Sequence, residues 1–168
     1  LRRSLLAAPA LIALGPAAFA AAMATPAQTR GPYYPVAKPA DFDLDLTRVA
    51  GRSQRAEGEV IEITGRVLSA RSGPVAGAEV EIWQADHQGR YHHPRERSGT
   101  ADPNFQGFGA VRTGAAGDFL FRTIRPRFYG SGAFIRTPHV HFRIAAAGRP
   151  ELVTQMYFPG EAMNARDA

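Results

Sequence analysis

Residues 59–85 read EVIEITGRVLSARSGPVAGAEVEIWQA. Apolar side chains alternate with polar ones in both halves of this stretch, at Ile61, Ile63, Val67, Val80 and Ile82. A period of two is typical of β-strands that bury one face, and Gly73-Pro74 between the halves is a turn signal. The stretch therefore predicts two strands separated by a turn, and not a helix.

The same pattern continues toward the C-terminus. Short apolar runs separated by glycine-containing turns are expected to form strands at Glu59–Leu68, Ala78–Ala85, Gly107–Thr113, Asp118–Ile124, Pro138–Ala145 and Leu152–Phe158. No segment has a helical period, and 17 Gly and 13 Pro among 168 residues disfavour long helices. The predicted fold class is all-β, an antiparallel β-sandwich that occupies residues 57–168.

The N-terminal third has a different composition. Residues 1–24, LRRSLLAAPALIALGPAAFAAAMA, combine Arg2-Arg3, an apolar stretch and small-residue cleavage sites, which predicts a signal peptide of the twin-arginine type. The protein is then expected to be exported, to the periplasm or outside the cell, and to have no membrane contact once the leader is removed. Residues 25–56 are Pro-rich and weakly periodic, and predict an extended arm.

Composition limits the chemistry that the chain can perform. Cysteine is absent, which excludes disulfides, thiolate metal ligands and a cysteine nucleophile. A transition metal would have to be held by His, Tyr or carboxylate side chains. The formal charge of +5 is spread along the chain without a basic run, so no nucleic-acid partner is expected.

The strongest local signal for a metal is His139-Val140-His141. Residues i and i+2 of a strand project from the same face, so the two imidazoles stand side by side. An ordinary pair of surface histidines is the alternative interpretation. Tyr91 and Tyr129 lie in loop-like contexts, and each taken alone is more typical of a half-buried packing residue than of a ligand.

Several ordered motifs accompany these residues: GPYY, ITGRVL, GPVAGAEVEIWQADHQGRYHHP, DPNFQGFG, GDFLFRTIRP, RTPHVHFRI and VTQMYF. In these motifs, and from about Ile63 to Phe158, the chain resembles the intradiol ring-cleavage dioxygenases. Within that family it is most similar to the iron-bearing (beta) subunit of protocatechuate 3,4-dioxygenases. Trp83 and Tyr91 have the separation of the family's W…GxY pattern.

The resemblance implies a role for each matched residue. The ligands of a non-haem Fe(III) cofactor would be Tyr91, Tyr129, His139 and His141, with Tyr129 as the labile one. Arg136 and Gln155 would take the places of the family's active-site arginine and glutamine. Four more residues are expected beside the substrate, with simple packing as the alternative role: Tyr33, Tyr34, Trp83 and Gly130.

The activity that the resemblance implies is cleavage of a catechol ring, such as that of protocatechuate, between its two hydroxyl-bearing carbons. The co-substrate is O2 and the product a cis,cis-muconate. Assembly through the N-terminal arm, as a homo- or hetero-oligomer, is also implied. Relatives continue beyond the MYF strand, so truncation of the sandwich at residue 168 is one interpretation, and a natural end there is the other.

Two other hypotheses remain open from the sequence. The GRV…GPVAGAxV…GDFxF pattern alone also fits a non-catalytic, prealbumin-like β-sandwich that serves as a binding or structural module. An inactive subunit of a dioxygenase assembly is the other. Both are disfavoured by the presence of all four ligand-type residues, which a structural module has no reason to keep.

Overall fold

The computed structural model describes residues 24–130 and 134–167; the predicted leader, apart from Ala24, lies outside them. The strands are β1 (Val60–Arg66), β2 (Leu68–Ser69), β3 (Gly73–Pro74), β4 (Glu79–Gln84), β5 (Phe108–Arg112), β6 (Asp118–Ile124), β7 (His139–Ala145) and β8 (Leu152–Tyr157). The all-β prediction is confirmed, and each of the six predicted strands forms within two residues of its expected ends. No helix in the described ranges is long and apolar enough to cross a membrane.

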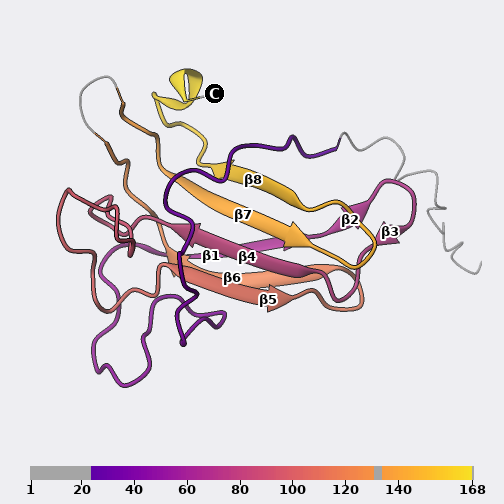
Figure 1. Cartoon of the computed structure of the whole chain (residues 1–168), viewed down its shortest axis with the longest axis horizontal. Coiled ribbons are helices and arrows are strands. Elements are labelled where there is room, and N and C mark those ends of the chain that lie inside the picture. The colour runs from indigo at the N-terminus through magenta and orange to yellow at the C-terminus, as the bar shows by residue number, and fades with distance from the viewer. Residues whose placement is uncertain (1–23, 131–133, 168) are drawn as a thin grey trace, which may run out of the picture.

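The strands form two layers (Figure 1). One layer is a four-stranded sheet in the order β5-β4-β7-β8, and the other is the β1-β6 pair; every pairing is antiparallel. The two-residue strands β2 and β3 pair in the connection from β1 to β4. The core between the layers is formed by Ile63 of β1, Phe121 of β6, and residues of β4 and β7.

The alternation of side chains along each strand determines which of them point away from the core. On β7, Val140 and Phe142 point into it, so His139 and His141 project from the opposite face of the four-stranded sheet. On β4, Trp83 projects from this same outer face, directly across from His141 in the strand register. The histidine pair is nevertheless buried, because the N-terminal arm covers this face.

The first part of the arm crosses the outer face of β7 and β8, and is drawn in indigo in Figure 1. The Gln28 amide donates to the Val153 carbonyl at 2.8 Å, and the Gln155 side-chain amide donates to the Thr29 carbonyl at 3.2 Å. Gly31, with φ +69°, passes so close to His141 that an added Cβ would lie 3.2 Å from the imidazole Cε1. The arm is therefore a wall of whatever site the histidines form.

A buried carboxylate anchors the arm. Glu81 of β4 is fully buried and accepts a hydrogen bond from the Tyr34 hydroxyl at 2.8 Å, while Lys38 and Arg143 form ion pairs with it. Burial opposes ionisation, but the hydrogen bonds from Lys38 and Tyr34 and the charge of Arg143 outweigh it and lower the pKa of Glu81. Tyr34, a predicted substrate residue, thus uses its hydroxyl to hold the arm.

The second half of the predicted arm is part of the sandwich. Leu46 is fully buried in the main core, because its amide donates to the Arg122 carbonyl of β6 at 2.8 Å and its carbonyl accepts from the Gln106 amide at 3.0 Å. The arm already pairs with β6 from Leu44 and Asp45 onward, so the residues that cross the outer face of the sheet precede this part of the arm.

Candidate metal and active site

The two histidines of β7 direct their Nε2 atoms toward each other, 3.1 Å apart. The Nδ1 of His139 lies 2.6 Å from the Thr137 carbonyl, which can only accept, so Nδ1 carries the proton and Nε2 keeps its lone pair. At this separation, both Nε2 atoms can reach a single metal ion at an imidazole–metal distance of roughly 2 Å.

Both imidazoles are neutral at physiological pH. Burial lowers the pKa of His139, and it lowers the pKa of His141 to about 2, assisted by the neighbouring His139 and by the charge of Arg136. Neither ring therefore has to lose an imidazolium proton when a metal binds at neutral pH. For both Nε2 atoms to coordinate, His141 must carry the single proton of its neutral ring on Nδ1.

Two tyrosines join the histidines from different loops. The ring centroids of Tyr91 and Tyr129 lie 5.2 Å apart; Tyr91 is 6.5 Å from His141, and Tyr129 is 5.5 Å from His139. Tyr91 is buried, and its hydroxyl has no hydrogen-bond partner among the described residues. Tyr129 is half-buried. Burial raises the pKa of both phenols, well above the ordinary value for Tyr91.

The loop after β4 places Tyr91 through a turn built on Asp86. This buried carboxylate accepts from the amides of Gln88 at 2.8 Å, Arg90 at 2.9 Å and Asp102 at 2.8 Å. Gly89 in the same turn has φ +82°, and an added Cβ would lie 2.3 Å from the Phe128 carbonyl oxygen. The turn therefore packs against the segment that carries Tyr129. Sequence reasoning missed Asp86, although an Asx turn before a glycine is a recognisable signal.

We expect Gly89→Ala to separate the two tyrosine loops. The left-handed backbone alone costs a non-glycine residue about 1–3 kcal/mol, and the collision with the Phe128 carbonyl adds to it. Gly77→Ala is the matched control, because Gly77 has φ +69° and open space around its Cβ position. Urea unfolding should show a clearly larger loss of stability for Gly89→Ala. Equal losses in the two variants would contradict the close packing of the loops.

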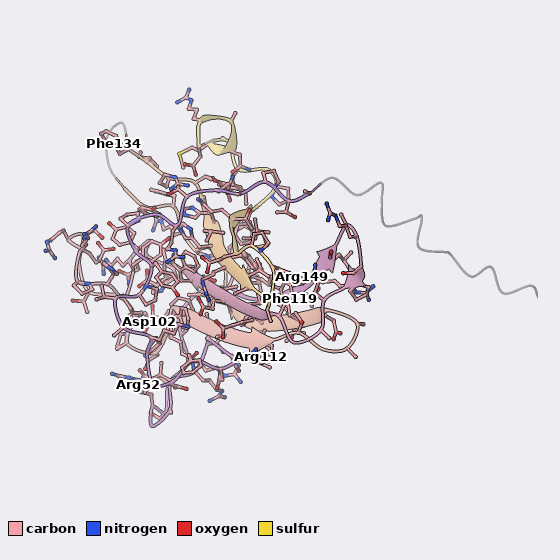
Figure 2. The ribbon with its side chains drawn as sticks, turned by 45° about the vertical axis from the view of Figure 1, so that its right-hand side comes forward. Arg52, Asp102, Arg112, Phe119, Phe134 and Arg149 are labelled. Atoms are coloured by element: carbon pink, nitrogen blue, oxygen red, sulfur yellow. The ribbon has the colours of Figure 1, made fainter. Side chains whose placement is uncertain are left out.

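The remaining predicted site residues surround this cluster. Trp83 stacks on His141 with centroids 4.8 Å apart and planes 3° from parallel, and Tyr33 of the arm stacks on Tyr91 at 4.5 Å. Tyr33, Tyr129 and Gly130 line a cavity of about 520 Å³. Phe134 also lines it and is 86% exposed; Figure 2 shows it at the outer end of its segment, away from the sheets.

Arg136 and Gln155, which the motifs indicated separately as site residues, lie together in the structure. The Arg136 Nη2 donates to the Gln155 Oε1 at 2.8 Å. Arg136 and Tyr129 exchange backbone hydrogen bonds of 2.8 and 3.2 Å, which holds the guanidinium beside the tyrosine cluster. Its charge opposes the burial that raises the pKa of Tyr129.

The donor set fits a hard, highly charged cation. No group of three or more His, Cys, Asp or Glu side chains in the described ranges could hold a metal, so the two histidines need other ligands. The Tyr91 and Tyr129 phenols are the candidates, since their rings lie beside the histidines. The Tyr91 hydroxyl and the His141 Nδ1 are buried without partners there. Anionic phenolate oxygens stabilise ferric ion, and a bound cation ionises phenols that burial alone would keep protonated.

Comparisons with known proteins show the family to which the chain is related. A family model described as "Dioxygenase" matches residues 29–168, which include all four candidate donors. The protocatechuate 3,4-dioxygenase beta chain of Burkholderia cepacia is 40% identical over 146 residues, which cover 82% of this chain and 62% of that protein. Catechol 1,2-dioxygenase 1 of Acinetobacter lwoffii is 36% identical over 115 residues, covering 60% of this chain and 36% of that protein.

This chain thus spans less than two thirds of the length of these curated relatives. Among solved structures, the dioxygenase domain of a dioxygenase–carbohydrate-binding fusion protein from Streptomyces sp. SirexAA-E superposes with a TM-score of 0.64. The sequence identity is 33%, and the match covers 86% of this chain and 80% of that one.

Proposed function

Because this chain belongs to the intradiol ring-cleavage dioxygenase family, we propose that it cleaves a catechol between its two hydroxyl-bearing carbons, with O2, to a cis,cis-muconate. The observation that carries the proposal is the convergence of two neutral imidazoles and two partly or fully buried phenols on the outer face of β7. Both oxygen atoms enter the product, so the reaction requires no external reductant.

Tyr91, Tyr129, His139 and His141 would hold a non-haem Fe(III). The ferric ion would bind both catechol oxygens, promote their ionisation and withdraw electron density from the ring, which makes the ring reactive toward O2. Tyr91 and Tyr129 would bind as anionic phenolates, so each would release its proton when iron binds. The affinity of the protein for iron is therefore expected to rise with pH.

The two tyrosines have different surroundings and therefore different roles. Tyr91 is 3% exposed and packed between Tyr33 and Tyr129, which suits a permanent ligand. Tyr129 is half-buried and lines the cavity of about 520 Å³, where a substrate enters. We assign to the Tyr129 oxygen the task of accepting one of the two catechol protons.

Arg136 supplies a fixed positive charge at the site. Its pKa is raised because the hydrogen bond and charge of Asp167 outweigh the effect of burial, so the guanidinium is charged throughout. A charge fixed beside the reacting ring stabilises negative charge that develops there during reaction. Gln155 bonds the same guanidinium and, through its amide nitrogen, the arm.

A carboxylated catechol of the protocatechuate type is the substrate we favour, since a relative of that name is 40% identical. The cavity of about 520 Å³ beside Tyr129 also leaves room for a larger ring substituent. The Ala-rich leader, with Arg2-Arg3, supports export of the protein. Assembly with a second chain is supported by the alpha and beta chains named among the relatives.

Oxygen uptake by the iron-loaded protein tests the activity. Protocatechuate, catechol and a caffeoyl-type catechol are offered in parallel, and uptake with at least one of them is expected. Two phenolates on Fe(III) absorb visible light by charge transfer, so the loaded protein should be burgundy. A colourless protein with bound iron would contradict the ligand assignment. A burgundy protein that consumes no oxygen with any of the three would support the inactive-subunit hypothesis.

A further inference from the structure

The carboxylate of Asp167, near the end of the described chain, is directed at the site arginine. The side chain is only 4% exposed and forms an ion pair with the Nε of Arg136. Its second oxygen accepts a hydrogen bond from the Thr137 amide at 3.0 Å. A carboxylate is costly to bury unless it is paired, and here the partner is the guanidinium beside Tyr129.

The guanidinium is held from a second side by Gln155. The Gln155 Oε1 accepts from the Arg136 Nη2 at 2.8 Å and from the Tyr157 hydroxyl at 3.2 Å. Arg136 therefore has Asp167 on its Nε edge and the end of β8 on its Nη2 edge. Two directed contacts restrict a long side chain that otherwise has many rotamers available.

Asp167 is itself fixed to the segment that leads into β7, the strand that carries the histidines. It follows a short 3₁₀ helix, Asn164–Arg166. The Asn164 side chain accepts from the Thr137 hydroxyl at 2.9 Å and donates to the Phe158 carbonyl at 2.8 Å. Thr137 is fully buried, and its carbonyl bonds His139. The carboxylate thus has a defined position relative to both β7 and β8.

We propose that Asp167 is a positioning residue of this site: it fixes the Arg136 guanidinium so that its charge is directed at the bound catechol. This inference rests on the proposed function. Preorganised charge is effective in catalysis because it requires no reorganisation during the reaction. Without the carboxylate, Arg136 keeps its charge but gains other orientations.

The test compares Asp167→Asn with wild-type protein, both loaded with iron. We expect the iron content and burgundy colour to be retained. We expect kcat/KM to fall about 10- to 100-fold, which is the effect typical of changing a residue that orients a metal ligand. Glu161→Gln is the matched control. It breaks the 2.6 Å ion pair between Arg125 and the same C-terminal segment, but Glu161 has no contact with Arg136 among the described hydrogen bonds and ion pairs, and kcat/KM should stay unchanged.

A double-mutant cycle separates positioning from a general structural effect. If Asp167 acts through Arg136, adding Asp167→Asn to Arg136→Gln causes no further loss of kcat/KM. Binding of 4-nitrocatechol gives a readout without turnover: its absorption band reports ionisation of the ring hydroxyls, and it should shift in Asp167→Asn and Arg136→Gln alike. Losses that multiply, or an unshifted band with wild-type kcat/KM in Asp167→Asn, would overturn the inference.

The measurements distinguish an error in the proposed activity from an error in the role of Asp167. If wild-type protein turns over none of the catechols, the ring-cleavage activity is wrong, and the 4-nitrocatechol band still tests Asp167. If wild-type protein is active and Asp167→Asn matches it in both readouts, only the positioning role is wrong.

Discussion

The His141→Ala protein is expected to lose its iron and its colour. His141 supplies one of two Nε2 atoms that lie 3.1 Å apart, and alanine leaves the other imidazole without its partner donor. Changes to residues that only orient a metal ligand cost 10- to 100-fold in affinity, so loss of a ligand should exceed about 100-fold. Iron content per chain after dialysis measures the effect.

Two further variants make this result specific. His87→Ala removes a histidine whose Nε2 pairs with Glu57 at 3.1 Å, and should keep wild-type iron. In the His141→Gln protein, the longer side chain fills more of the space against Trp83 than alanine does, so the fold is less disturbed. This variant too should lose iron. Equal iron in wild type and both His141 variants would remove His141 from the metal site.

The Tyr129→Phe protein is expected to keep iron but lose most of its turnover. Three donors remain, among them the buried phenol of Tyr91, so the visible band should weaken without vanishing. The lost oxygen is the one assigned to accept a catechol proton, and proton transfer of this kind is worth about 100- to 10,000-fold in rate. Oxygen uptake at saturating catechol, together with iron content, measures the two effects.

Tyr91→Phe provides the comparison for this result. Because Tyr91 is buried and Tyr129 half-buried, removal of the Tyr91 oxygen should weaken iron binding more than removal of the Tyr129 oxygen. If Tyr129→Phe lost its iron while Tyr91→Phe kept both iron and activity, the permanent and the labile tyrosine would have to be exchanged.

The strands and the histidine face followed from the sequence because their signals are local. The period of two at Ile61, Ile63 and Val80 predicted buried strand faces, and β4 and β7 formed within a residue of their expected ends. The same period put His139 and His141 on one face. Alternation depends on the geometry of a single strand, so no knowledge of its neighbours was needed to predict it.

The burial of the histidines and the extent of the core depended on contacts between segments far apart in the chain. The sequence around His139-Val140-His141 does not predict that the arm covers these side chains. Their burial depends on Gly31, which passes beside His141, and on the buried Glu81, which holds the arm through Tyr34 and Lys38. For the same reason the sequence did not show that Leu46 belongs to the core.

The arginine that the motifs indicated also acquired its partner only through tertiary structure. Arg136 and Asp167 are 31 positions apart, and no periodicity relates them. Their pairing exists because Asn164 ties the C-terminal turn to Thr137. Sequence determined which side chains can perform chemistry here, whereas packing of distant segments decided which of them meet, because burial and charge pairing are properties of the assembled fold.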